Sequence, residues 1–304
     1  MSTTNLALPS RLEALRIELS AEIPCFPATA EIRAALQSLP LQEVLFSWVH
    51  WAQRFVRPSP RKINYYSGFW DEQALAQRSK IEAIAAQISS GADLTPLLSD
   101  RVKTHGYVPK NQSERTARGI DWQKMDFAIN AYEVHHLHLD QSGTEELLFV
   151  KFDRETATFI LLGTHKSFFN GDIEEAITRL RAESGEWELK GIEALERDLT
   201  PQNRTRAALY GISTIAPIGK KFVLSGLVST AGTSMGTSLL SDRIEHTLAD
   251  DDAKIDSSAI EELIPPEYIS RLRGRNWRWA MHYCDLVLIE EESKMAFVRI
   301  QGPN

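Results

Sequence analysis

The chain has 304 residues, of which 43% are hydrophobic and 25% charged, and its formal net charge at pH 7 is −7. This composition is typical of a soluble globular protein, and the acidic balance argues against broad nonspecific binding of nucleic acid, which needs a basic face. No apolar run reaches the roughly 18 residues of a membrane span, and the amino-terminal stretch turns amphipathic too early for a signal peptide. We therefore expect a cytoplasmic protein with no membrane contact.

The first 120 residues carry mainly helical patterns. Apolar residues recur at helical spacing, and prolines or glycine end the longer runs. A polar stretch, Lys103–Gly119, has the composition of a loop. The expected helices cover residues 10–21, 29–38, 41–55 and 71–89.

From Tyr132 the period of the pattern changes from helical to strand-like. Three short runs rich in Val, Ile, Leu, Phe and Thr are separated by Gln-Ser-Gly-Thr and by Asp-Arg-Glu. Connections this short favour adjacent antiparallel strands, so region 121–185 is expected to hold a β-meander followed by a helix over 172–183. The expected strands are 132–140, 145–152 and 156–163.

Residues 186–304 carry a looser pattern of helices and strands. Two strands are expected within 211–228, a helix over 242–248, a solvated loop at 250–252, and a final hairpin formed by 277–290 with 295–301. The overall prediction is an α+β protein with a helical region 1–120, the meander region 121–185 and an α+β region 186–304.

No motif points to a cofactor. Cys25 and Cys284 lie far apart and lack CxxC spacing, so neither a disulfide framework nor a thiolate metal site is indicated. The Gly-rich segment 226–238 has no Gly-Lys-Ser/Thr ending, which favours a tight turn before a helix over a phosphate-binding loop. The sequence therefore predicts no cofactor.

The meander brings histidines together. Alternation along a strand places His136 and His138 on one face and His135 on the other. A first turn at Ser142-Gly143 would place His138 opposite about Leu147, and a second turn near Arg154 would place Glu145 opposite about Gly163. His138, an acid at Glu145 or Glu146, and His165 should then meet.

Two imidazoles and a carboxylate suit general acid–base chemistry, because an unperturbed histidine titrates near pH 6.5. The candidate catalytic residues are His136, His138, His165, Glu145 and Glu146. Cations placed where negative charge develops stabilise a phosphorane-like transition state. The candidate cations are Lys151, Arg154 and Lys166.

The pattern His138-x₆-Glu-(Glu)-Leu-Leu-Phe-Val-Lys-Phe, followed by Phe-Ile-Leu-Leu-Gly-Thr-His165-x₃-Phe169, resembles the core of the RelE superfamily, especially its YafQ-type mRNA interferases. The resemblance implies a sheet that binds mRNA at the ribosome and a histidine-assisted attack of the ribose 2′-OH on the adjacent phosphate. It also adds Phe169 to the substrate-binding residues. An antitoxin or another protein partner is expected in such a system.

The resemblance covers about 40 residues, and this chain departs from it in several ways. The usual toxin is small and basic, whereas this chain is long and acidic. The aromatic residue that commonly follows the acid is replaced by Glu146 or Leu147. The His-His-Leu-His-Leu run is also similar to uncharacterised phage and mobile-element proteins, which fits a toxin–antitoxin or phage-defence setting.

Two other functions stay open at this point. His136, His138 and His165, with Asp140 or Glu145, could ligate Zn²⁺ or Fe²⁺ in a metal-dependent hydrolase. The meander could instead be a scaffold in a protein that only binds a partner. Two mixed basic and aromatic clusters, at 50–62 and 271–279, could contact RNA or be solvated surface.

Overall fold

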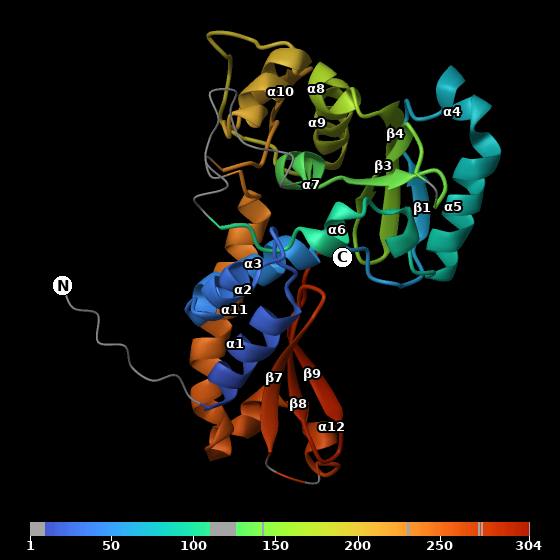
Figure 1. The fold of residues 1–304 in the computed structure, drawn as a ribbon. Helices are drawn as coiled ribbons and strands as arrows, with labels where there is room; N and C mark the ends of the chain where they lie inside the picture. The colour runs from blue at the N-terminus through green and yellow to red at the C-terminus, as the bar shows by residue number, and fades with distance from the viewer. Residues whose placement is uncertain are drawn as a thin grey trace. The chain divides into compact units, whose positions relative to one another are not determined.

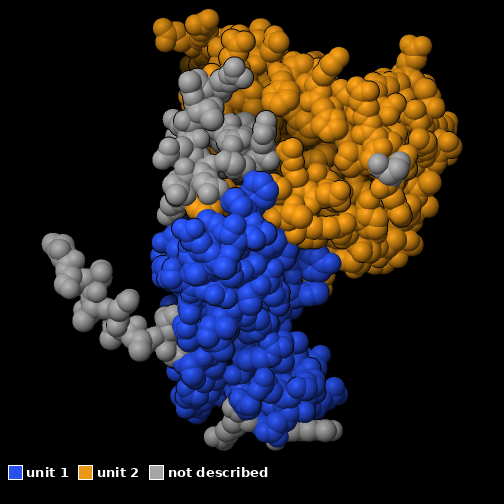
Figure 2. Space-filling model, in the orientation of Figure 1, with its two compact units in different colours: residues 1–53, 237–303 blue, residues 54–236, 304 orange. Residues whose placement is uncertain are grey.

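The computed structural model describes residues 10–109, 126–141, 143–229, 232–272, 274 and 276–303. It has the expected α+β class and divides into two compact units (Figure 2): unit 1 joins residues 1–53 to 237–303, and unit 2 covers 54–236. Each unit draws on more than one of the three regions expected from the sequence. None of the described helices is both long and apolar enough to cross a membrane.

Unit 1 packs amino-terminal helices with a long carboxy-terminal helix and a three-stranded antiparallel sheet in the order β7-β8-β9. The helices expected over 10–21 and 29–38 are present, and Thr29 caps the second by accepting a hydrogen bond from Ile32 N at 3.3 Å. Its elements are α1 (Ser10–Glu22), α2 (Ala30–Gln37), α3 (Leu41–Ala52), α11 (Met235–Ile255), η3 (Ser258–Leu263), α12 (Pro266–Ile269), β7 (Trp277–His282), β8 (Asp285–Glu290) and β9 (Met295–Ile300).

Two expectations for unit 1 were wrong. The aspartate run at 250–252 is not a solvated loop, because Asp251 and Asp252 are buried in α11. Asp252 accepts hydrogen bonds from Trp279 Nε1 at 2.9 Å and from Arg11 Nε at 3.0 Å, so tertiary partners stabilise what the charge run alone disfavours. The final hairpin is a three-stranded sheet, because 277–290 is itself a hairpin.

Unit 2 is built on a four-stranded sheet in the order β1-β4-β3-β2. The meander is present as expected, although its first strand begins at His135 because 127–132 form a helix. A strand missed by the sequence analysis, β1, pairs in parallel with β4. The strands are β1 (Lys62–Tyr65), β2 (His135–His138), β3 (Glu146–Phe152) and β4 (Thr156–Thr164).

Both faces of this sheet are covered (Figure 1). Leu148, Val150 and Phe159 pack on one face with the apolar side of α5, while Leu147 and Phe149 pack on the other with residues of α7 and α9. Strands buried on both faces are nearly continuous apolar runs, as β3 and β4 are. The helices and short strands of the unit are α4 (Glu72–Ala76), α5 (Arg78–Ser90), η1 (Thr95–Leu97), α6 (Arg101–Thr104), α7 (Phe127–Tyr132), α8 (Ser167–Asn170), α9 (Asp172–Ser184), α10 (Pro201–Leu209), β5 (Ile215–Ile218) and β6 (Lys221–Leu224).

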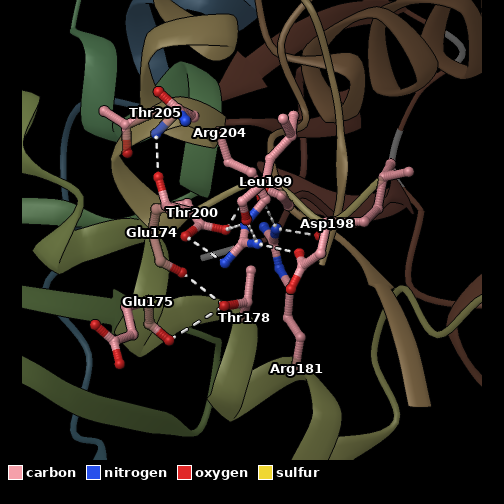
Figure 3. Close-up of polar contacts among 12 residues, drawn as sticks. Glu174, Glu175, Thr178, Arg181, Asp198, Leu199, Thr200, Arg204 and Thr205 are labelled. Carbon is pink, nitrogen blue, oxygen red and sulfur yellow. Dashed lines mark hydrogen bonds and ion pairs between the residues drawn. The ribbon is translucent and has the colours of Figure 1, made fainter. Parts of the chain in front are cut away.

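A buried ion pair joins α9 to α10 (Figure 3). Glu174 is fully buried and accepts two hydrogen bonds from Arg204, from Nε at 2.7 Å and from Nη2 at 3.2 Å. Ser225 Oγ donates a third at 2.8 Å. Burial raises the pKa of Glu174, and Arg204 and Ser225 act in the opposite direction. These contacts are internal and complete, which is the arrangement of a structural ion pair.

Several expected features fall wholly or partly outside the described residues. They are most of the loop Lys103–Gly119, Ser142 of the first expected turn, part of the Gly-rich segment 226–238, and Arg273 and Arg275 of the second basic cluster.

Candidate functional site

The carboxyl end of β2, the start of β3 and the end of β4 lie side by side, as the sequence predicts. His138 pairs with Leu147, and Glu146 pairs with Thr164. His165 follows β4 directly. His138 and His165 are therefore brought to the same edge of the sheet.

The predicted pairing of Glu145 with Gly163 was wrong, because Gly163 pairs with Leu147. Phe152 pairs with Ala157, so the second turn is centred between Arg154 and Glu155. A β-bulge between Phe149 and Val150 in the register then leaves Ile160 of β4 without a partner. The turn and the bulge together shift the pairing by two residues.

Three histidine rings form a chain across this edge. The ring centroids of His136 and His138 are 6.5 Å apart, and those of His138 and His165 are 6.3 Å apart. His135 lies on the opposite face, as predicted, and its ring contacts Phe152 at a centroid distance of 5.2 Å. His165 is exposed and His138 is half-buried, so a ligand from solvent can reach the pair.

His138 is fixed by the loop between β2 and β3. Its Nδ1 lies 3.1 Å from both the backbone N and the backbone O of Thr144. Thr144 also donates from Oγ1 to Glu146 O and accepts at Oγ1 from Leu139 N, which closes the loop over the strand ends. Since Nδ1 is held by backbone, Nε2 is the nitrogen left for chemistry.

His136 lies deeper and behaves differently. Its Nδ1 is 3.5 Å from Asp126 Oδ2 and forms no hydrogen bond with the described part of the chain. Burial lowers the pKa of His136, and the nearby imidazoles of His138 and His165 add to this, while Asp126 opposes it. His136 is thus suited to be a neutral supporting group.

An aromatic cluster backs the histidines. The ring of Phe168, on α8, contacts His136 at 5.2 Å, Phe149 at 5.4 Å and His165 at 6.2 Å between centroids. Phe169, the next residue, is 56% exposed. The cluster positions the imidazoles on one side, and Phe169 offers an aromatic surface to solvent.

The other predicted residues are spread over the sheet. Since Leu147 shares a face with His138, alternation places Glu146 on the opposite face, and Glu145 is exposed just before β3. Lys166 is exposed beside His165 at the start of α8.

Lys151 and Arg154 lie away from His138 and His165. They lie at and beyond the far end of β3, roughly 15–25 Å along the strand from its first residue at about 3.3 Å per residue. Lys151 forms an ion pair with Glu186. Neither cation is placed to act on a group bound between His138 and His165.

The described residues contain no group of three or more His, Cys, Asp or Glu side chains arranged to hold a metal ion. The metal-site alternative names five residues, His136, His138, Asp140, Glu145 and His165, and all five are described. The metal-dependent alternative therefore gains no support from the geometry.

The sequence analysis missed three residues that contact the candidate histidines: Asp126, Thr144 and Phe168. Asp126 caps α7 by accepting a hydrogen bond from Ile129 N at 3.3 Å, which also holds its carboxylate near His136. An Asp before an apolar helical run is the cap signal that could have revealed it. Phe168 was within the quoted motif but was passed over for Phe169.

Comparison with protein-family models, with curated proteins and with solved structures finds no match to this chain.

Proposed function

We propose that this protein cleaves RNA, with His138 and His165 as an acid–base pair that acts without a metal ion. The observation that carries the proposal is the 6.3 Å separation of the two ring centroids at a solvent-accessible strand edge. Two imidazoles at this spacing can flank a single phosphodiester. Each positioned acid or base contributes about 10²–10⁴-fold to the rate.

In the proposed reaction one imidazole accepts the proton of the ribose 2′-OH as that oxygen attacks the adjacent phosphorus. The second, protonated imidazole donates its proton to the departing 5′-oxygen. The P–O5′ bond breaks, and the products are a 2′,3′-cyclic phosphate and a 5′-hydroxyl. Both protons are accounted for, and no cofactor is required.

The neighbouring residues support this assignment. Lys166 supplies a positive charge next to His165, where the developing charge on phosphate would lie. The exposed ring of Phe169 can stack with a base, a contact that tolerates any sequence. Neutral His136 and Phe168 act as positioning residues behind the pair.

The same residues carry the proposed relation to RelE-type interferases, with His138, His165 and Phe169 in the matching positions. The setting that follows is a toxin–antitoxin or phage-defence system, with RNA or a ribosome as substrate and a protein that restrains the activity. Glu146 lies on the opposite face of β3 from His138, and Glu145 is exposed before β3 begins, so we assign neither of them a step.

The test is cleavage of a fluorogenic RNA by the purified chain in the presence of EDTA. We expect His138→Ala and His165→Ala each to lose about 10²-fold or more in kcat/KM. His246→Ala, at an exposed histidine on α11, is the matched control and should keep the wild-type rate. Wild-type cleavage that EDTA abolishes, or rates unchanged in both site variants, would contradict the proposal.

A further inference from the structure

The outer strand of the unit 1 sheet has an open edge. β9 pairs with β8, and within the described residues its other edge forms no backbone hydrogen bond. Outer strands are usually protected by solvent-facing charges or proline. The sequence of β9 is Met-Ala-Phe-Val-Arg-Ile. Its one charged side chain, Arg299, donates hydrogen bonds to Asp251 Oδ2 at 2.9 Å and to Leu263 O at 3.1 Å. The edge is therefore apolar and unprotected.

A hollow of about 710 Å³ lies beside this edge. Leu263, Ile264 and Tyr268 line it together with Phe297 and Val298, and Val298 is 50% exposed. Tyr268 packs against Phe297 at a centroid distance of 5.8 Å, which gives the hollow an aromatic floor.

The described segment that lines the other side of the hollow forms no backbone hydrogen bond with β9. It contains Pro265 and Pro266, whose backbones have no N–H to donate. The hollow therefore offers apolar surface on one side and unused strand backbone on the other. This combination fits an extended peptide that adds to the sheet as a strand.

The charged side chains of the hollow indicate which net charge a bound peptide should have. Glu261 and Glu262 line it and are exposed, and Lys254 lies 3.3 Å from Glu262. Arg299, the cation of the lining, is already paired with Asp251. Lys254 thus pairs with Glu262 and Arg299 pairs with Asp251, so Glu261 leaves the hollow with a net negative charge, and a bound segment with Lys or Arg would be complementary.

We propose that this hollow is a docking site for an extended, basic segment of another protein, which pairs with the open edge of β9. Alternate apolar side chains of the segment enter the hollow, and its Lys or Arg lies near Glu261 and Glu262. A second copy of this chain fits less well, because its own β9 would bring no available cation. The proposal does not depend on RNA cleavage by unit 2.

The experiment uses the full chain and a fluorescein-labelled peptide pool of the pattern Thr-Val-Thr-Lys-Thr-Val-Thr, in which Val and Lys share one face of the strand, with Ile, Leu or Arg varied at matching positions. We expect saturable binding by fluorescence anisotropy. Methylation of alternate peptide backbone nitrogens should weaken it at least about tenfold, because two strand hydrogen bonds are lost. The Glu261→Gln/Glu262→Gln double variant should weaken it about threefold to fivefold.

Glu175→Gln, a change at an exposed carboxylate of unit 2, is the control and should leave binding unchanged. Hydrogen exchange should show new protection at residues 295–300 when the peptide is bound. No binding by the pool, or equal binding of a pool with Glu in place of Lys and Arg, would overturn the proposal. Sedimentation that shows a dimer lost in Val298→Lys would overturn it as well, since a second copy would then occupy the edge.

Discussion

The two sheets of this protein differ in how their surfaces are covered. The sheet of unit 2 has apolar clusters on both faces, and its central strands β3 and β4 consist of buried and half-buried residues. The sheet of unit 1 has three strands, and β9 carries two exposed residues, Ala296 and Val298, along an open edge. The first arrangement fixes histidines at strand ends, and the second leaves backbone available for a partner.

The same contrast holds for buried charge. In unit 2 the side chains of Glu174 and Arg204 are 0% and 6% exposed. In unit 1 those of Asp252 and Arg11 are 6% and 18% exposed. Removing one partner of an ion pair lowers the free energy of unfolding more when the pair is more completely buried, because the remaining charge is not solvated. We therefore expect unit 2 to tolerate the loss of a charge less well.

The largest expected effect tests this contrast directly. Glu174→Ala should lower the free energy of unfolding by about 3–5 kcal/mol, because the 6% exposed side chain of Arg204 loses its buried partner and keeps Asp198, whose side chain is 64% exposed. Asp252→Ala should cost about 1–3 kcal/mol, since Arg11 reaches solvent and keeps Asp256. Urea unfolding measures both.

Glu175→Ala is the control for this pair of variants. Glu175 lies next to Glu174 on α9 but forms an exposed pair with Arg179, so its removal should cost no more than roughly 0.5 kcal/mol. Equal losses for Glu174→Ala and Asp252→Ala would break the proposed difference between the units.

A smaller effect concerns the junction of α8 and α9 that holds the aromatic cluster. Gly171 has φ +101°, and an added Cβ would lie 2.8 Å from the backbone N of Gln202. Gly171→Ala should therefore cost about 2–4 kcal/mol from backbone strain and overpacking. Gly191, at φ +81° with open space around it, is the matched control, and Gly191→Ala should cost only about 1–2 kcal/mol. Thermal or urea unfolding that ranks Gly191→Ala as the worse variant would show that the packing here is looser than described.

The smallest effect is a pH dependence. Because burial lowers the pKa of His136, the unfolded chain binds its proton more readily than the folded chain does. The stability that depends on neutral His136 is complete above about pH 6.5 and is lost as pH falls toward the lowered folded-state pKa. His136→Gln should therefore reduce the loss of stability between about pH 7.5 and about pH 5.

Urea unfolding midpoints at the two pH values measure the loss of stability in wild type and in His136→Gln. Burial also lowers the pKa of His105, but that residue contributes to wild type and variant alike, so the difference reports on His136. His246→Gln, at an exposed position, should leave the pH dependence as in wild type. An unchanged pH dependence in His136→Gln would mean that His136 does not titrate as proposed.

Local patterns were enough to predict much of the fold. Alternating apolar residues and short turns gave the meander and the pairing of His138 with Leu147. Helical spacing predicted α1, α2 and α9. In these segments the local preference agrees with the final packing, which is why the sequence alone is informative.

The features that depend on distant residues could not be predicted. β1 is four residues long and partly polar, and it is a strand because it pairs with β4, about 90 residues later. The helix at Asp251 depends on Arg299, and the environment of His136 depends on Asp126. The bulge that contributes to the shift of Glu145 away from Gly163 lies where two adjacent residues of β4, Ile160 and Leu161, both pack against the same core, which strand alternation does not predict.

The most direct test of the central claim uses an oligonucleotide of DNA that contains one ribonucleotide. We predict cleavage only on the 3′ side of that nucleotide, with 2′,3′-cyclic phosphate and 5′-hydroxyl ends, and at least about a 10²-fold loss of rate in the His138→Ala/His165→Ala double variant. Cleavage of an all-DNA control at the same rate, or a double variant as active as wild type, would contradict an acid–base pair formed by these two histidines.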